Sequence, residues 1–282
     1  MPFTISHAAV VLPFSRLLAR WRLLSAAVIG AMVPDFGLFF PWRVYRFETH
    51  SVTALLTFCL PVGMATYWVF QYLVKTPMLE VLPEGAYARW RPFSSRAYIH
   101  NGRQWILAAF GVLVGAVTHL VWDAFTHENA RGIRMIPWLE DPVVGIGRHR
   151  VAGVQLMQDG SSLLGLVIVI GLVWYGLRRG RETPVPSRPL RSAERRAWVA
   201  IYVAAAVGLG AACWLWARAG SPGHSIRPVV MAVPGMNGIT AIAVACLRGL
   251  ALALLCTSMA LDWRLRALRL ASARRPPQRA GV

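Results

Sequence analysis

Charged residues are scarce in this chain: they make up 15% of its 282 residues, whereas 56% are hydrophobic and the mean hydropathy is +0.48. Acidic residues are the scarcer kind, 12 against 30 lysines and arginines, so the formal net charge is +18. Soluble domains carry about 25% charged residues. The composition therefore excludes an ordinary soluble domain and predicts an all-α, polytopic membrane helical bundle.

Cysteine is equally scarce, and its pattern excludes two kinds of site. The four cysteines stand alone inside apolar runs and form no C-x-x-C pair, so neither a disulfide framework nor a thiolate metal site is expected. No Walker loop, dinucleotide-binding fingerprint or G-x-S-x-G elbow occurs in a fitting context. The basic residues lie between hydrophobic spans, where positive charge sets topology, so we expect no nucleic-acid partner.

Five apolar segments are long enough, or nearly so, to cross a hydrocarbon core of about 30 Å. They are Val52–Val74, Gln104–Trp122, Ser162–Leu177, Ala197–Ala217 and Gly238–Leu261. Before them, two shorter apolar stretches flank a basic tip at Arg16–Arg22. They predict either one helix with a surface arm or a short helical hairpin, giving about six to seven hydrophobic helices in all.

The charge of the connecting segments alternates along the chain. Net charges of about +3 to +5 fall on four segments: Arg16–Arg22, Lys75–Arg103, Arg178–Arg196 and the tail from Asp262. The segments between them are nearly balanced, from about −1 to +2. The positive-inside rule therefore places the first group, with the C-terminus, in the cytoplasm.

Composition shifts also predict a domain organisation. Residues 1–180 form a membrane-embedded part, residues 181–196 a basic, proline-containing cytoplasmic linker, and residues 197–263 a C-terminal pair of transmembrane helices. Residues 264–282 are expected to be a basic disordered tail.

The stretch Gly115–His127, GAVTHLVWDAFTH, ends the second long apolar run and carries His119, Asp123 and His127. Steps of four residues advance about 400° around a helix, so these three side chains project from nearly one face. Imidazole, carboxylate and imidazole along one stripe can hold a divalent cation. The alternative is a helix end meeting water, with each side chain solvated separately.

Three further polar residues converge on the same membrane face when the topology is followed. The hairpin interpretation returns His7 and Asp35 to the outer face, and His50 precedes a helix that runs inward from that face. Ionisable groups near a bilayer are costly and usually mark function. The sequence therefore predicts one outer site formed by these three residues together with His119, Asp123 and His127.

Histidine and carboxylate ligands without cysteine suit zinc, manganese or iron, and water on zinc can have its pKa lowered to about 7. Six ligands exceed one tetrahedral site, so one or two divalent ions, with zinc preferred, are expected. Two ions suit phosphoester displacement. Asp159, in QDGSS, is a further candidate ligand on the outer side, although a helix cap is the more ordinary role.

The motifs MPFTISHAA, MVPDFG, THS, THLVWDAFTH and QDGSSLLG resemble domain-of-unknown-function family 4184, a family of uncharacterised bacterial multi-pass membrane proteins. The resemblance covers about residues 1–180 and implies the bacterial cytoplasmic membrane. More distantly, the order of histidines and aspartates is similar to inner-membrane metal-dependent hydrolases and to the zinc-dependent phospholipase C and single-strand nuclease superfamily. That similarity implies all six residues as ligands, with Asp123 bridging two zinc ions.

These observations favour an integral membrane metal-dependent hydrolase that acts on a phosphoester or lipid-derived substrate at the outer face. Asp123 or Asp35 would place the nucleophile. A transporter or proton-relay protein, or a non-catalytic scaffold with a structural metal site, would use the same polar residues. The expected partners are membrane lipids and the substrate, and the sequence names no protein partner.

Overall fold

The computed structural model describes residues 4–40, 44–94, 101–127, 130–146, 149–179, 182–185, 187–219 and 238–273. The chain divides into two compact units, which are described separately below. Unit 1 comprises Met1–Trp68 and Ala97–Arg178, and unit 2 comprises Val69–Arg96 and Arg179–Val282.

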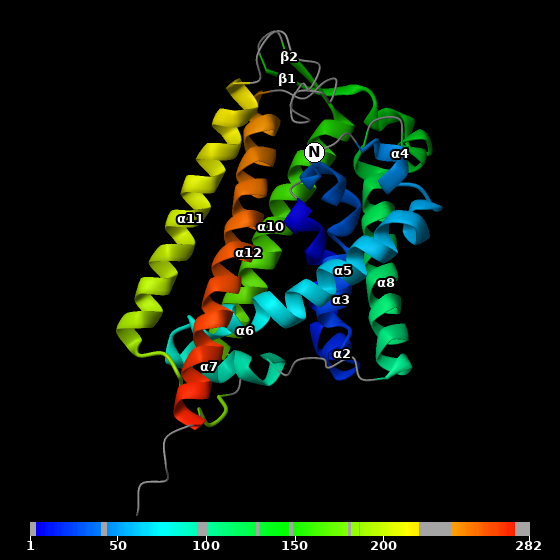
Figure 1. Ribbon diagram of the computed structural model, residues 1–282. Coiled ribbons are helices and arrows are strands. Elements are labelled where there is room, and N and C mark those ends of the chain that lie inside the picture. The colour runs from blue at the N-terminus through cyan, green and yellow to red at the C-terminus, as the bar shows by residue number, and fades with distance from the viewer. Residues whose placement is uncertain are drawn as a thin grey trace, which may run out of the picture. The chain divides into compact units, whose positions relative to one another are not determined.

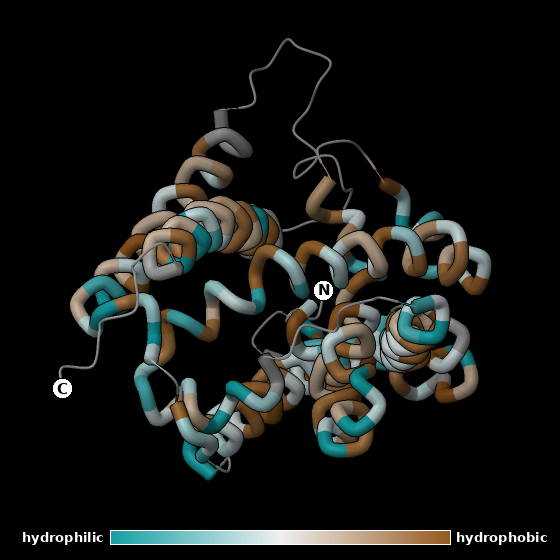
Figure 2. Tube along the Cα trace, turned by 60° about the horizontal axis from the view of Figure 1, so that its bottom comes forward, coloured by the Kyte–Doolittle hydropathy of each residue, from teal (hydrophilic) through white to brown (hydrophobic). Residues whose placement is uncertain are grey.

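Helices dominate both units, as predicted, and five of them among the described residues are long and apolar enough to cross a membrane (Figure 1). These candidate spans are Leu55–Glu80, Gly102–Thr126, Gly153–Arg179, Ser192–Leu215 and Val244–Ala271. Each overlaps one predicted apolar segment, and hydrophobic residues recur along the long helices of each unit (Figure 2). The predicted all-α membrane bundle is confirmed.

In unit 1, the N-terminal stretch forms a helical hairpin. Its elements are η1 (Thr4–His7), α1 (Ala8–Val11), η2 (Leu12–Phe14), α2 (Ser15–Arg20) and α3 (Leu24–Gly30). The chain reverses at Arg22, whose φ of 59° lies in the left-handed region, and Val11 then packs against Ala27 and Ala31. Of the two alternatives, the hairpin is therefore the one that forms.

Helix α3 packs closely along α8 (Gly102–Thr126), which begins at the Asn101 cap. Glycines permit this approach: a Cβ on Gly115 would meet the backbone of Ala27, and a Cβ on Gly30 would meet the backbone of Val112. Small residues at a helix crossing let two backbones come together in this way. The contact fixes the C-terminal end of α3 beside the middle of α8, at Val112 and Gly115.

Short elements follow the hairpin and lead into the first long span. They are η3 (Val33–Phe39), α4 (Arg46–Thr49), the π-helical η4 (Leu55–Cys59) and α5 (Leu60–Val69). The Ser51 hydroxyl accepts a hydrogen bond from the backbone N–H of Ala54 and so caps the start of the span. These elements carry the chain back across the end of α8.

The connection after α8 contains structure that the sequence analysis did not predict. Its elements are α9 (Arg131–Arg134), η7 (Pro137–Leu139) and the antiparallel strands β1 (Pro142–Ile146) and β2 (His149–Ala152). Ile133 and Leu139 pack with Val154 beneath this hairpin. Helix α10 (Gly153–Arg179) consequently begins at Gly153, well before the predicted Ser162.

Unit 2 contains η5 (Phe70–Val74), α6 (Lys75–Glu80), α7 (Glu84–Trp90), η6 (Arg91–Ser94), α11 (Ser192–Ala219) and α12 (Gly238–Ala273). Leu190 packs with Leu261 and Leu265 of α12, and the buried Arg188 guanidinium donates to the Leu82 carbonyl at 3.0 Å. The predicted domain boundaries stay predictions. Of the predicted tail, residues up to Ala273 belong to α12, and residues 274–282 lie outside the described residues.

The α3–α8 contact makes a testable prediction. Gly115→Ala should lower the free energy of unfolding in detergent by about 1–3 kcal/mol, because the added methyl group meets backbone that cannot move aside. Gly171→Ala, on α10 with open space around it, is the matched control and should be neutral or stabilising by up to about 1 kcal/mol. Equal thermal shifts for the two variants would contradict the close packing.

Candidate metal centre

Helix α8 supplies the centre of a polar cluster. His119 and Asp123 are almost fully buried, and His119 Nε2 lies 3.5 Å from Asp123 Oδ2. His127 follows the last residue of the helix, with its Nδ1 3.3 Å from Asp123 Oδ1. The structure thus gathers these three residues at the end of α8, as their spacing predicts.

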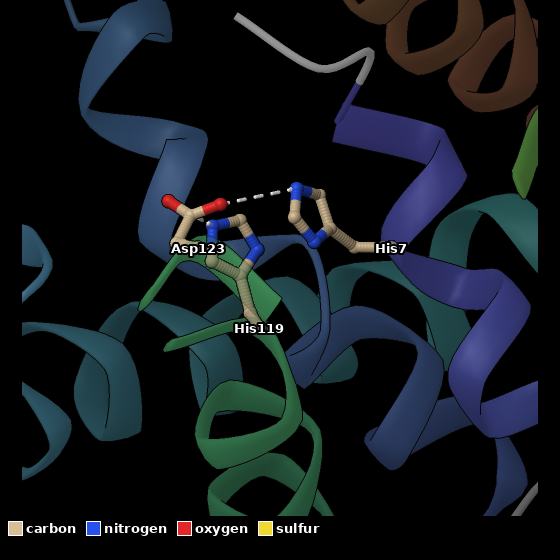
Figure 3. A group of neighbouring side chains, drawn as sticks. All are labelled: His7, His119 and Asp123. Carbon is tan, nitrogen blue, oxygen red and sulfur yellow. Dashed lines mark ion pairs between the residues drawn. The ribbon is translucent and has the colours of Figure 1, made fainter. Parts of the chain in front are cut away.

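His7 reaches this cluster from the N-terminal segment (Figure 3). Its Nε2 lies 3.7 Å from Asp123 Oδ1, and its ring stacks on that of His119 with the centroids 3.7 Å apart. The neighbouring residue Ser6 donates a hydrogen bond to the carbonyl of Ser162 at 2.7 Å. Gly165, one turn along α10, leaves room for Ser6, so α10 fixes the position of His7.

Asp35 and His50 complete the cluster from η3 and from the residue after α4. His50 Nε2 lies 3.4 Å from Asp35 Oδ1 and 3.5 Å from Asp123 Oδ2. Asp35 Oδ1 is also 3.8 Å from His119 Nε2. All six predicted residues therefore meet in one place within unit 1, although their role as ligands stays a prediction.

The separations in the cluster fit a shared cation better than direct hydrogen bonds. The nitrogen–oxygen distances between its histidines and aspartates run from 3.3 to 3.8 Å. An N–H···O bond spans about 2.7–3.2 Å. Two ligands of one tetrahedral zinc ion, each about 2.0–2.2 Å from it, lie about 3.4 Å apart. Two groups have ligand atoms within 4.8 Å of one another: His7, His119 and Asp123; and Asp35, His50 and His119.

Unsatisfied polar atoms provide the test of whether these residues fit a metal ion. Within the described part of the chain, six buried side-chain atoms have no hydrogen-bond partner, and every one belongs to the cluster. They are His7 Nδ1 and Nε2, His50 Nε2, His119 Nε2, Asp123 Oδ1 and His127 Nε2. Leaving one such atom unpaired costs about 1–3 kcal/mol. A cation would satisfy several of them at once, so the residues fit a metal ion.

Hydrogen bonds behind the cluster leave lone pairs facing its centre. His119 Nδ1 lies 2.8 Å from the carbonyl oxygen of Ala31, which can only accept, so Nδ1 carries the proton and Nε2 is free. The Thr49 hydroxyl donates to the Arg46 carbonyl and therefore accepts from His50 Nδ1 at 2.6 Å. Such outer partners fix the tautomer of metal-binding histidines.

The protonation state of two histidines, His50 and His127, also favours metal binding. Burial lowers the pKa of His127 to about 4 and lowers that of His50 below its usual value. Both imidazoles are therefore neutral at pH 7, which is the form that binds metals.

Arg46 is a part of the cluster that the sequence analysis missed. Its Nη2 donates to Asp123 Oδ2 at 2.6 Å, and its side chain is 45% exposed. The one available signal was its position four residues before His50 in RFETHS. That signal was insufficient because the contact with Asp123 joins residues 77 positions apart.

The one other sequence candidate, Asp159, lies outside the cluster. Asp159 is exposed on α10 and occurs in neither potential metal-binding group, and it does not cap the helix because α10 begins at Gly153. From the same motif, Ser161 instead accepts a hydrogen bond from Trp122 Nε1 at 3.2 Å. Glu48, in the same short helix as Arg46, accepts a hydrogen bond from the backbone N–H of Tyr45.

Taken together, the long apolar helices and the buried histidine–aspartate cluster define a multi-pass membrane protein with side chains that could hold a metal ion. The chain belongs to the family described as a domain of unknown function, DUF4184, which it matches over residues 1–259. The match extends well past residue 180, where the resemblance in the motifs ends. No curated protein and no solved structure matches the chain.

The cluster predicts stabilisation by metal. Zinc at about 100 times its dissociation constant should raise the free energy of unfolding by about 2.7 kcal/mol, because the folded protein binds it and the unfolded chain binds it poorly. A thermal-shift titration in detergent measures this effect. His119→Ala should abolish it, and Asp159→Asn, a control outside the cluster, should retain it. A zinc response that survives His119→Ala would place the metal elsewhere.

Proposed function

We propose that this protein is an integral membrane metal-dependent hydrolase that acts on a phosphoester or lipid-derived substrate at the outer face of the bacterial cytoplasmic membrane. The observation that carries the proposal is a set of buried nitrogen and oxygen atoms, on four histidines and one aspartate, that have no hydrogen-bond partner. A buried polar group without a partner is rare in folded proteins, and each one requires an explanation.

The two oxygens of Asp123 divide the cluster into two sets of donors. Oδ1 faces His7 and His127, and Oδ2 faces His119 and His50. Asp35 joins the second set, since its Oδ1 is near both His50 and His119. Asp123 could thus bridge two divalent ions, and nitrogen and oxygen donors without thiolate suit zinc.

The chemistry of phosphoester hydrolysis divides between the bound ions and the residues. A divalent ion held here would polarise a phosphoryl oxygen and lower the pKa of water. Asp123 or Asp35 would orient the attacking water. His119 is held from behind by Ala31 and keeps its ring fixed while charge changes nearby.

The position of the cluster supports action at the membrane surface. His127 follows the end of the Gly102–Thr126 span, and His50 precedes the Leu55–Glu80 span. The donors therefore lie where two spans meet the head-group region. The segments around them, 41–51 and 123–161, have little net charge, which supports an outer location for this end.

The proposal is tested by metal content and turnover of detergent-purified protein. Wild-type protein should contain zinc in stoichiometric amounts and hydrolyse bis(p-nitrophenyl) phosphate. His119→Ala and Asp123→Ala should each lose metal and reduce turnover by at least about 100-fold, since outer partners of metal ligands alone are worth about 10- to 100-fold. Asp159→Asn is the matched control and should retain both properties.

The other outcomes separate the competing functions. Zinc without turnover of any phosphodiester would favour a structural metal site. Metal-free protein that moves protons across vesicle membranes would support a transporter and contradict the hydrolase.

The topology makes a separate prediction. In a cysteine-free background, Tyr45→Cys and Met135→Cys, both at exposed positions in the two segments expected on the outer side, should react with a membrane-impermeant maleimide in intact spheroplasts. Glu84→Cys, in the basic segment on the opposite side, should react only after permeabilisation. The reverse pattern would move the site to the cytoplasmic face.

A further inference from the structure

Arg46 places a half-exposed positive charge at the edge of the candidate metal centre. Among the described residues, its guanidinium has one recorded partner, Asp123 Oδ2. Asp123 is itself buried, with 6% of its side chain exposed, so the 45% exposed Arg46 forms the boundary between the cluster and the outside. A guanidinium carries five N–H donors in a fixed fork. Asp123 leaves most of these donors available.

With a divalent ion bound, the charge of the centre would favour an anion from outside. Asp35 and Asp123 contribute about −2, while Arg46 and a single divalent ion contribute about +3, and a second ion widens the difference. An unbalanced charge is costly in a buried site at a membrane. Phosphate oxygens match the guanidinium fork in geometry as well as charge. The half-exposed edge at Arg46 is therefore suited to a phosphate group.

An open groove borders α4, the short helix that carries Arg46. Its volume of about 660 Å³ is typical of small-molecule sites. Its lining residues are Phe40, Val44, Phe47, Glu48, Ser51, Thr53, Thr57, Phe58 and Val62. The polar members are already engaged with one another or with nearby backbone: Glu48 accepts from the Tyr45 N–H, Ser51 pairs with Thr53, and Thr57 donates to the Thr53 carbonyl. What the groove offers a ligand is therefore mainly aromatic and aliphatic surface.

The residues that line the groove adjoin, in sequence, both the cluster and the first long span. Phe47 and Glu48 lie in α4 directly after Arg46, and Ser51 directly follows His50. Thr57, Phe58 and Val62 lie at the start of the Leu55–Glu80 span. A ligand in the groove would accordingly have one end beside Arg46 and His50 and the other at the level of the hydrocarbon chains.

We infer that the substrate is an amphiphilic phosphoester, with its phosphate held by Arg46 and its hydrocarbon chain lying in the Phe40–Phe58–Val62 groove. The inference rests on the proposed hydrolase function and gives it a substrate class. Arg46 would then bind the substrate phosphate, and the groove would set the enzyme's preference for the length of the substrate's hydrocarbon chain.

The groove is tested with alkyl p-nitrophenyl phosphate diesters that carry methyl, butyl, octyl and dodecyl groups, presented to full-length protein in detergent at fixed micelle concentration. Each methylene buried in the groove adds up to a few-fold to binding, so kcat/KM should rise by at least about tenfold from methyl to dodecyl. Val62→Trp fills the groove and should remove this rise, so that the methyl and dodecyl diesters have similar kcat/KM, with zinc content unchanged. Leu56→Trp is the matched control, because it adds the same side chain at an exposed position of η4 outside the groove lining.

Phosphate binding by Arg46 is tested with inorganic phosphate as a competitive inhibitor. Arg46→Gln should weaken phosphate inhibition and raise KM for the methyl diester by at least about tenfold, with zinc content unchanged. Arg46→Lys should recover part of the loss, because it restores the charge without the fork. Loss of zinc in Arg46→Gln would instead give Arg46 a structural role toward Asp123 and overturn its role in binding phosphate.

Failure of this inference and failure of the proposed function give different results. Protein without zinc or turnover of the methyl diester would overturn both. Zinc-dependent turnover that is independent of chain length, and equal in wild type and Val62→Trp, would overturn the amphiphilic substrate alone and leave the hydrolase standing.

Discussion

The burial of the Asp123 carboxylate is the constraint on which the rest of unit 1 depends. A carboxylate withdrawn from water costs several kcal/mol unless positive charge and hydrogen bonds replace its hydration. Arg46 supplies one positive charge to Oδ2, but Oδ1 is left without a hydrogen-bond donor and faces the rings of His7 and His127. The imidazoles gathered around it are unpaired as well, and burial keeps His50 and His127 neutral. A divalent cation would resolve both deficits together, because it would balance the carboxylates and accept the free lone pairs.

The packing of unit 1 holds these donors in position. Gly30 and Gly115 bring α3 against α8, and that contact carries the Ala31 carbonyl to His119. The bond from Ser6 to Ser162 fixes the segment bearing His7 against α10. The remaining ligand candidates come from short elements rather than long helices: Asp35 lies in the 3-10 helix η3, and His50 directly follows α4. The chain can therefore present side chains from several directions around the end of α8.

The sequence predicted the parts of this arrangement that follow from local pattern or from charge. Hydropathy located the five spans, and the spacing of His119, Asp123 and His127 gave their common face. Loop charges brought His7, Asp35 and His50 to the same end without any contact being known. Arg46 was not predictable, because its role depends on packing between residues far apart in the chain. The β1–β2 hairpin was missed because its residues lie in a polar connection without clear alternation, and the early start of α10 was missed because Gly153–Gln158 is less apolar than the span that follows.

The composition and the edge of the cluster support the proposed reactive centre over a purely structural one. Structural zinc sites are closed, four-coordinate and rich in cysteine. This cluster contains four histidines and two aspartates, more donors than one such ion needs, and no cysteine is among them. Its edge is also open, since Arg46 is half exposed and the apolar groove begins at the next residue. A structural ion would require neither additional metal ligands nor a positively charged edge. A phosphoester with a hydrocarbon chain, in contrast, requires both an edge that binds anions and an apolar path from the membrane.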